Sequence, residues 1–313
     1  MKILNLDKPI IQWLLLLLLA FVWGSSFILM KRGLETFSNF QVASLRIAIA
    51  YFFLLPIAIK NLRKIKGKYW GYLLIAGLLG NGLPAFLFTT AQTQISSSLT
   101  GMLNSLVPLF TVLVGLIGFG LKLRIKRFAG VLLGLVGAIG LLSVQGLNFG
   151  DSNLAYALLV VLATICYATN INFIKTYLGP INSIDITAFG FFFLGPPVIL
   201  YLFMSDFYHI MQSDPEATTN LFYIALLSVF GTALAVILFN ILIKKVSAVY
   251  ASSVTYIIPI FALMWGFIDG EVIKGMHILW ISVILSGIYI VNRENLKLNR
   301  KAKKELKPQN LNK

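Results

Sequence analysis

Apolar runs of about 20 residues recur along the whole chain, each separated from the next by a short segment that carries the charge. A bilayer core about 30 Å thick is crossed by about 20 helical residues, and open strands cannot leave backbone groups unpaired in lipid. The sequence therefore predicts an all-α integral membrane protein with ten transmembrane helices, at roughly 10–31, 39–59, 69–91, 97–119, 125–143, 153–175, 183–204, 218–243, 247–268 and 276–292.

The composition agrees with a chain that is surrounded by lipid. Of its 313 residues, 58% are hydrophobic and 12% are charged, whereas soluble domains carry about 25% charged residues. The net charge of +15 suggests nucleic acid at first sight, but the cations lie between the apolar runs and in the tail at 293–313. Because this placement is typical of topology determinants, we expect the lipid bilayer, and no nucleic acid, as a partner.

The cations also predict the orientation of the chain. If the N-terminus is cytoplasmic, 22 of the 26 Lys and Arg residues fall in cytoplasmic segments and three fall outside. Cytoplasmic loops carry such an excess, so we expect both termini in the cytoplasm. No small-x-small cleavage pattern follows the first run, which we interpret as an uncleaved span. Lys31 and Arg32 run against the rule.

Internal repeats divide the chain into two halves. Residues 77–88 align with 228–239, and 96–110 with 247–261, at one offset of 151, while 21–34 align with 165–178 at an offset of 144. The predicted units are a first five-helix repeat at 1–147, a second at 148–292, and a basic cytoplasmic tail at 293–313. Because five is odd, the second repeat enters the membrane upside down, which is typical of secondary transporters with a site at the repeat interface.

Several segments in this order resemble a known family. They include "WGSSFILMKRGL" and "ASLRIAIAYFFLLP" in the first half, and "YIIPIFALMWGFIDGE" and "ISVILSGIYIV" in the second. With the duplicated layout, the chain outside its tail resembles the ten-helix, EamA-type branch of the drug/metabolite transporter superfamily. That family often has a Glu after the fourth helix of each half; Glu271 stands there, but Gly120 takes the other place. The resemblance implies export or exchange of metabolites, amino acids or drugs across the inner membrane.

Polar side chains inside the first and sixth spans are candidates for substrate binding. Trp23 and Ser26 stand three residues apart, as do Tyr167 and Asn170, and residues at this spacing share a helix face. Pseudo-symmetry would turn both faces toward one central cavity, where the aromatic rings flank a ligand and the polar groups hydrogen-bond it. The alternative is plain interhelical packing, in which small and polar residues join neighbouring helices.

The third, fourth and ninth spans supply further candidates. We add Asn81 and Phe88 of the third span, Asn104 of the fourth and Tyr256 of the ninth to the predicted substrate-binding residues. Pro108 and Pro259 occupy matching places in the two halves. Since proline frees a backbone carbonyl and kinks a membrane helix, the pair predicts hinge or gate elements, with static kinks as the alternative.

Three cations near or within the spans need a reason. Arg46 lies about seven residues into the second span, where an arginine costs roughly 2.5–3.5 kcal/mol on insertion scales. We favour a structural or gating role for it over direct substrate contact. Lys31 and Lys175 are repeat partners that end the two polar faces on opposite sides of the membrane, and we assign them a gating or structural role as well.

Several kinds of chemistry are missing. No Asp or Glu lies at the centre of a span, which argues against a buried proton carrier. The chain has one cysteine, Cys166, and no motif for a cofactor, a metal or a nucleophile. We therefore expect no cofactor and no catalytic residue.

These patterns favour a secondary transporter for small neutral or zwitterionic solutes, working by alternating access as an exporter or facilitator. The alternatives are a membrane-embedded enzyme acting on a lipid or polyprenyl substrate, and a receptor or scaffold that does not transport. Gly130, Gly134 and Gly137 form a stripe of small residues in the fifth span. Close helix packing is its default interpretation, and a homodimer seam is the weaker one.

Overall fold

The computed structural model describes residues 9–120, 125–144, 152–245, 251, 254–287 and 289–290, and the secondary structure of these residues is helical. Seven helices are long and apolar enough to cross a membrane, judged by length and composition. Three shorter apolar helices lie at Leu132–Leu141, Ile257–Ile268 and Gly275–Gly287. Each of these ten helices falls on one of the predicted apolar runs, so the all-helical membrane architecture is confirmed.

In the first half, the helices and short turns follow the predicted spans closely. They are α1 (Pro9–Leu34), α2 (Asn39–Asn61), the 3-10 turns η1 (Leu62–Lys64) and η2 (Gly67–Tyr69), α3 (Trp70–Gly77), the π-helix η3 (Leu78–Gly82), α4 (Leu83–Ala91), α5 (Ser97–Asn104), α6 (Val107–Gly118) and α7 (Ile125–Val144). α2 begins with a capping box, in which Ser38 and Gln41 satisfy each other's backbone N–H groups.

The second half is also helical and contains an additional short helix, α10 (Phe207–Ser213). Its elements are α8 (Ser152–Tyr177), α9 (Ser183–Met204), α10 (Phe207–Ser213), α11 (Ala217–Leu226), the π-helix η4 (Leu227–Leu234), α12 (Ala235–Lys245) and α14 (Val254–Ile268). The helix Gly275–Gly287 follows α14. The short α10 was not predicted, since it lies in a polar loop between apolar runs.

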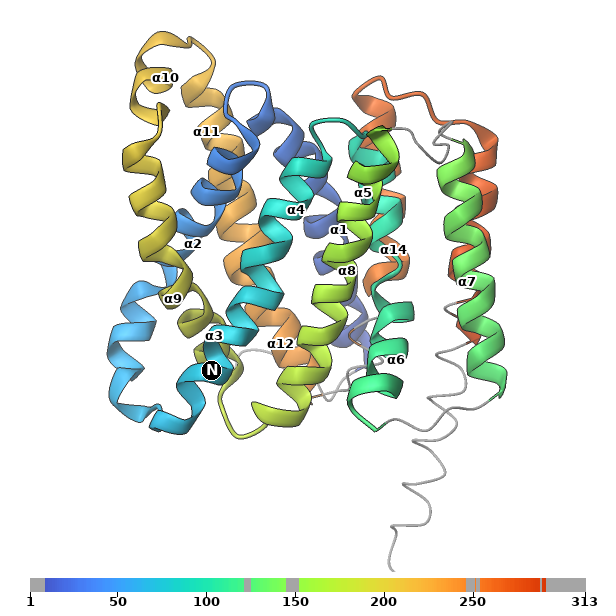
Figure 1. Cartoon of the computed structure of the whole chain (residues 1–313), viewed down its shortest axis with the longest axis horizontal. Helices are drawn as coiled ribbons and strands as arrows, with labels where there is room; N and C mark the ends of the chain where they lie inside the picture. The colour runs from blue at the N-terminus through green and yellow to red at the C-terminus, as the bar shows by residue number, and fades with distance from the viewer. Residues whose placement is uncertain are drawn as a thin grey trace, which may run out of the picture.

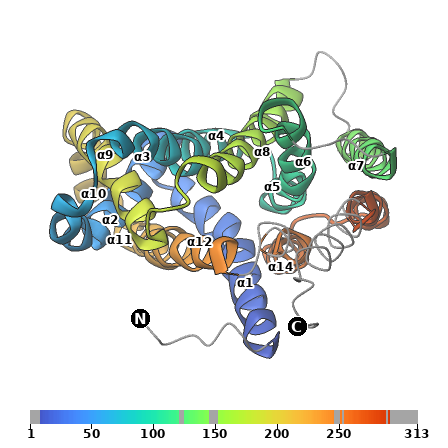
Figure 2. The same cartoon turned by 90° about the horizontal axis from the view of Figure 1, so that it is seen from below.

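The helices stand side by side in one bundle (Figure 1), and the closest packing joins the two halves. α2 packs on α9, α1 on α14, and both α4 and α6 on α8. Viewed from below, α3, α4 and α8 lie along one side of the bundle, and α11, α12 and α1 lie along the other (Figure 2). The site described below lies where these two rows meet.

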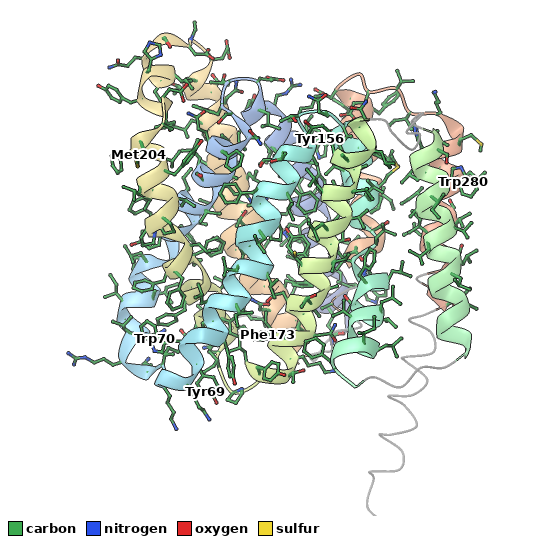
Figure 3. The ribbon with its side chains drawn as sticks, in the orientation of Figure 1. Tyr69, Trp70, Tyr156, Phe173, Met204 and Trp280 are labelled. Carbon is green, nitrogen blue, oxygen red and sulfur yellow. The ribbon has the colours of Figure 1, made fainter. Side chains whose placement is uncertain are left out.

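The first helices of the two halves run in opposite directions. α1 ends at the upper edge of the bundle, where the chain turns into α2 (Figure 1). α8 begins at that edge, with Tyr156 near its upper end and Phe173 near its lower end (Figure 3). Tyr69 and Trp70 lie at the lower edge, at the start of α3. Aromatic residues at the ends of spans are typical of the membrane interfaces.

Two π-helices interrupt spans that the sequence presents as uniform. η3 covers Leu78–Gly82 and η4 covers Leu227–Leu234, and the repeat offset of 151 places the first within the second. Apolar periodicity cannot distinguish a π turn from an α turn over so short a stretch, so the sequence did not predict them. Single π turns are often found at functional sites.

The fourth span is two helices rather than one. α5 ends at Asn104 and α6 begins at Val107, with Pro108 in the first turn of α6. A proline in that turn has no N–H to give to the carbonyl of Asn104, which favours a new helix start. Its repeat partner Pro259 lies inside the continuous helix α14, so the two prolines are not structurally equivalent.

The glycine stripe of the fifth span packs within the chain. A Cβ added to Gly137 would lie 2.8 Å from Ile284, and one added to Gly287 would lie 2.6 Å from backbone atoms of Gly130 and Gly134, so the stripe faces the helix Gly275–Gly287. The next glycine, Gly140, would bring a Cβ to 2.3 Å from Trp280 of the same helix. Trp280 stands beside α7 in Figure 3. Close helix packing is thus the use of this stripe, and a homodimer, which stays a prediction, would need another face.

Candidate functional site

A cavity of about 110 Å³ lies between the two halves of the bundle. Its volume exceeds the roughly 30 Å³ share of one water several-fold, so it can hold a small solute or a cluster of waters. Seven of the eight residues predicted to bind substrate line it, namely Trp23, Ser26, Asn81, Phe88, Asn104, Tyr167 and Asn170. The eighth, Tyr256, lies on α14, but its side chain is outside the described residues.

Two aromatic pairs form opposite parts of the cavity wall. Trp23 of α1 meets Phe239 of α12 edge to face at 5.0 Å between ring centroids, and Tyr167 of α8 stacks on Phe88 of α4 at 5.8 Å. Trp23 and Tyr167 are repeat partners, and so are Phe239 and Phe88. Each pair therefore joins the first helix of one half, α1 or α8, to the span of the other half that contains a π-helix.

Two glycines make room for the polar side chains of the cavity. A Cβ on Gly80 would lie 2.2 Å from Nδ2 of Asn170, and a Cβ on Gly231 would lie 2.7 Å from Oγ of Ser26. Gly80 and Gly231 are repeat partners within η3 and η4, as Ser26 and Asn170 are within α1 and α8. The same contact therefore occurs twice, with each half supplying one glycine and one polar side chain.

The π turn of η4 also presents a carbonyl group to the site. Nε1 of Trp23 donates a hydrogen bond of 2.9 Å to the carbonyl oxygen of Gly231. This bond fixes the indole ring against η4, while Oγ of Ser26 donates to the Val22 carbonyl one turn back. Trp23 is therefore held in place before any ligand enters the cavity.

Arg46, for which the sequence favours a structural or gating role, lies in the cavity wall. The residue is 9% exposed, and its Nε donates a 2.7 Å hydrogen bond to Oγ1 of Thr232 in η4. The Tyr167 hydroxyl is a second neighbour. The single charged residue among the described residues of the lining is Arg46.

The other residues assigned gating or structural roles lie away from the cavity lining. Lys31 is in the last turn of α1, and Lys175 is exposed in the last turn of α8. Pro108 and Pro259 sit in α6 and α14 without lining the cavity. Their proposed functions therefore concern the ends and bends of helices rather than ligand contact.

Further wall residues stand at positions that the repeat indicates. Phe239 is the repeat partner of Phe88, and Thr255 is the repeat partner of Asn104. Thr232, which hydrogen-bonds Arg46, stands at the position that corresponds to Asn81. The repeat gives no such indication for Asn240; its Nδ2 donates to Oγ1 of Thr187 at 3.0 Å.

An ion-pair cluster at the upper edge accounts for the cations that break the positive-inside pattern. Lys31 and Arg32 both pair with Asp269, and Nζ of Lys31 also lies 3.4 Å from Glu271. The side chain of Asp269 is 7% exposed and that of Glu271 9%. The cluster thus ties the end of α1 to the loop after α14, and its carboxylates balance both cations.

Glu271 also caps the start of α5. Its Oε1 accepts hydrogen bonds from the backbone N–H (3.0 Å) and hydroxyl (2.7 Å) of Ser97, and its Oε2 accepts one from the Ser98 N–H (3.0 Å). Burial raises the pKa of Glu271, but these hydrogen bonds from Ser98 and Ser97 outweigh it, so the pKa lies below its ordinary value. The carboxylate is therefore charged at neutral pH and joins α1, α5 and α14.

Several known proteins of similar sequence are named as transporters. An uncharacterized transporter of Archaeoglobus fulgidus is 25% identical over 284 residues, which cover 90% of this chain and 99% of its own length. The uncharacterized inner membrane transporter YedA of Escherichia coli K12 is 26% identical over 283 residues, covering 87% and 88%. A crystal structure of a protein with 15% identity has a TM-score of 0.65, covers 93% of this chain and 99% of that one, and shows the same fold.

The family comparison matches the chain twice. The model of the EamA-like transporter family fits residues 11–143 and again residues 154–293. The matched family consists of transporters, which removes the alternative of a lipid-modifying enzyme. The chain is a multi-pass membrane protein and belongs to the EamA-like transporter family.

Proposed function

We propose that this transporter moves small neutral or zwitterionic metabolites, such as amino acids, by alternating access, as an exporter or facilitator. The composition of the cavity wall carries this proposal: the described residues that line it include aromatic rings and four asparagines and no Asp or Glu. A cavity without a carboxylate lacks the usual proton carrier and the usual anchor for an organic cation. Aromatic and amide groups suit compact solutes with both apolar and hydrogen-bonding parts.

We also propose that ten helices cross the inner membrane as two inverted five-helix repeats with both termini cytoplasmic. The three shorter apolar helices would supply the spans beyond the seven long ones. The opposite directions of α1 and α8, and the cross-half contacts of Ser26 and Asn170, support the inversion. YedA, a relative named as an inner membrane transporter, supports the assignment of this chain to the inner membrane.

Flux through the reconstituted protein tests the substrate class. Proteoliposomes loaded with a mixture of radiolabelled amino acids should release them down their gradient, and the double variant Trp23→Ala, Asn170→Ala should lose at least about 90% of this flux, because each aromatic–polar face loses one group. Phe203→Ala, at an 84% exposed position on α9 away from the cavity, serves as the control. A flux that appears only with an imposed pH gradient would contradict an uncoupled carrier.

The upper ion-pair cluster gives a test of alternating access. In a Cys166→Ala background, Met30→Cys places a thiol on the cavity wall near the end of α1. Asp269→Asn removes the carboxylate shared by Lys31 and Arg32, so we expect an impermeant maleimide added outside to label residue 30 several-fold faster. Glu35→Gln, which removes the exposed partner of Arg32 alone, should leave the rate unchanged. Equal rates in all three proteins would mean that the cluster does not close the outer side.

A further inference from the structure

The charge of Arg46 has no counter-ion in the cavity. Among the described residues, the ion pairs involve Lys31 and Arg32 at the upper edge, and none includes Arg46. The acidic residues of the described spans and loops sit at helix ends, as Asp185 does in the first turn of α9, where Asn61 hydrogen-bonds it. Since a guanidinium stays protonated in proteins, the cavity carries a fixed positive charge.

The neighbours of Arg46 orient it without satisfying it. Thr232 accepts the hydrogen bond of Nε, and Oγ1 of Thr232 in turn donates to the Leu227 carbonyl at 3.2 Å. The Tyr167 hydroxyl is the other polar neighbour. A guanidinium has five N–H donors in a planar fork, more than these two neutral groups accept. Thr232 and Tyr167 engage two of these donors, so further N–H groups of the guanidinium remain for a ligand in the cavity.

A buried, uncompensated charge of this kind is costly unless it meets an anion during function. The fork of a guanidinium matches the two oxygens of a carboxylate, and such bidentate hydrogen bonds are shorter and stronger than neutral ones. A wholly structural clamp on Thr232 would not need a charge, because a neutral side chain could donate the same bond.

The same cavity offers acceptors for a hydrogen-bond donor. Oδ1 of Asn104 and Oδ1 of Asn170 are buried without a hydrogen-bond partner among the described residues, and both residues line the cavity. Unpaired buried carbonyl oxygens are uncommon and favour a ligand that brings N–H groups. The wall therefore combines one cation with unused acceptors.

We propose that Arg46 is the anion subsite of the transporter and binds the carboxylate of a small carboxylate-bearing substrate, whose amino group meets Asn104 and Asn170. This inference deepens the proposed function and rests on it, since it selects zwitterions over uncharged solutes. Thr232 is a positioning residue for Arg46, because its hydroxyl holds Nε and not the terminal nitrogens. The site thus recognises the two ends of an α-amino acid with side chains from both halves.

Thermal unfolding of the purified full-length protein tests the subsite with matched probes. The probes are the amino acids that the protein transports in the flux assay or, if it transports none, all twenty. Each is compared with its amide, which lacks the carboxylate, and with its des-amino acid, which lacks the ammonium. We expect at least one amino acid to stabilise the wild type. Its amide should bind with an apparent affinity about tenfold lower or weaker still, which is the loss typical of a charged hydrogen-bonded pair. Arg46→Gln should bind the two equally, and Arg46→Lys should recover part of the preference.

The controls separate a binding defect from a folding defect. Arg63→Gln, at an exposed position in η1, should keep the full preference for the carboxylate. Thr232→Val should weaken it, while retention of stability in the absence of ligand shows that the fold is intact. The subsite is overturned if no carboxylate stabilises the wild type, or if Arg46→Gln keeps the preference. If the amides, or solutes without charge, bind and are transported equally well with Arg46→Gln, the transporter proposal stands and the subsite alone fails.

Discussion

Gly77→Ala should be among the most destabilising single substitutions in this protein. A Cβ on Gly77 would lie 2.8 Å from both Cα and the carbonyl oxygen of Gly190, so the clash is with backbone that no rotamer change can move. α3 and α9 would have to separate, and we expect a loss of about 1–3 kcal/mol or more. The measurement is the unfolding midpoint of purified protein in detergent.

Two other glycines calibrate this result. Gly71 lies on the same helix with nothing within 4 Å of its added Cβ, so Gly71→Ala should be neutral or slightly stabilising, by up to about 1 kcal/mol, through helix propensity. Gly190→Ala brings its Cβ to 3.2 Å from Cα of Gly77 and should fall between them. If all three variants unfold at the wild-type midpoint, α3 and α9 do not approach as closely as described.

Glu271→Ala should have a comparably large effect at the other end of the bundle. It removes the acceptor of two backbone N–H groups and one hydroxyl at the start of α5, and a partner of Lys31. Loss of a charged cap that is buried costs about 2 kcal/mol or more. Val272→Ala, at a 79% exposed neighbouring position, is the matched control for the loop.

The pH dependence of stability tests whether the negative charge of Glu271 is what stabilises the fold. Its folded pKa lies below the ordinary value of 4.5, so its contribution is fully present above pH 4.5 and is lost as the pH falls through the folded pKa. The difference in unfolding midpoint between wild type and Glu271→Gln should therefore be constant from neutral pH to about 5 and shrink below that. A difference that grows on acidification would contradict the role of the carboxylate.

The spans were predictable because membrane insertion imposes a length and a hydropathy that the sequence displays directly. The cavity residues on α1, α4, α5 and α8 were also predictable, since a polar side chain such as Asn104 inside an apolar run requires a reason. Their number could be extended with the repeat, as Phe239 and Thr255 show. Features that depend on a single polar residue within an apolar run could thus be predicted from the sequence.

Features that depend on partners far away in the sequence could not be predicted. The opposing carboxylate of Arg32 lies at Asp269, and nothing local to residue 32 indicates that loop. The placement of Arg46 could not be predicted for the same reason: depth within a span shows its energetic cost, but its bond to Thr232 and its position in the cavity wall depend on how η4 packs. The π turns, which shift the register of whole helix faces, left no distinct periodicity.

The exchange of glycine and polar contacts between the halves has a consequence for how this chain can change over time. Ser26 lies against Gly231, and Asn170 against Gly80, so enlarging either glycine requires shortening a side chain encoded in the other half. Substitutions at these four positions should therefore arise in pairs among related chains. Although the two halves repeat one unit, these contacts make the substitutions that one half tolerates depend on the residues present in the other.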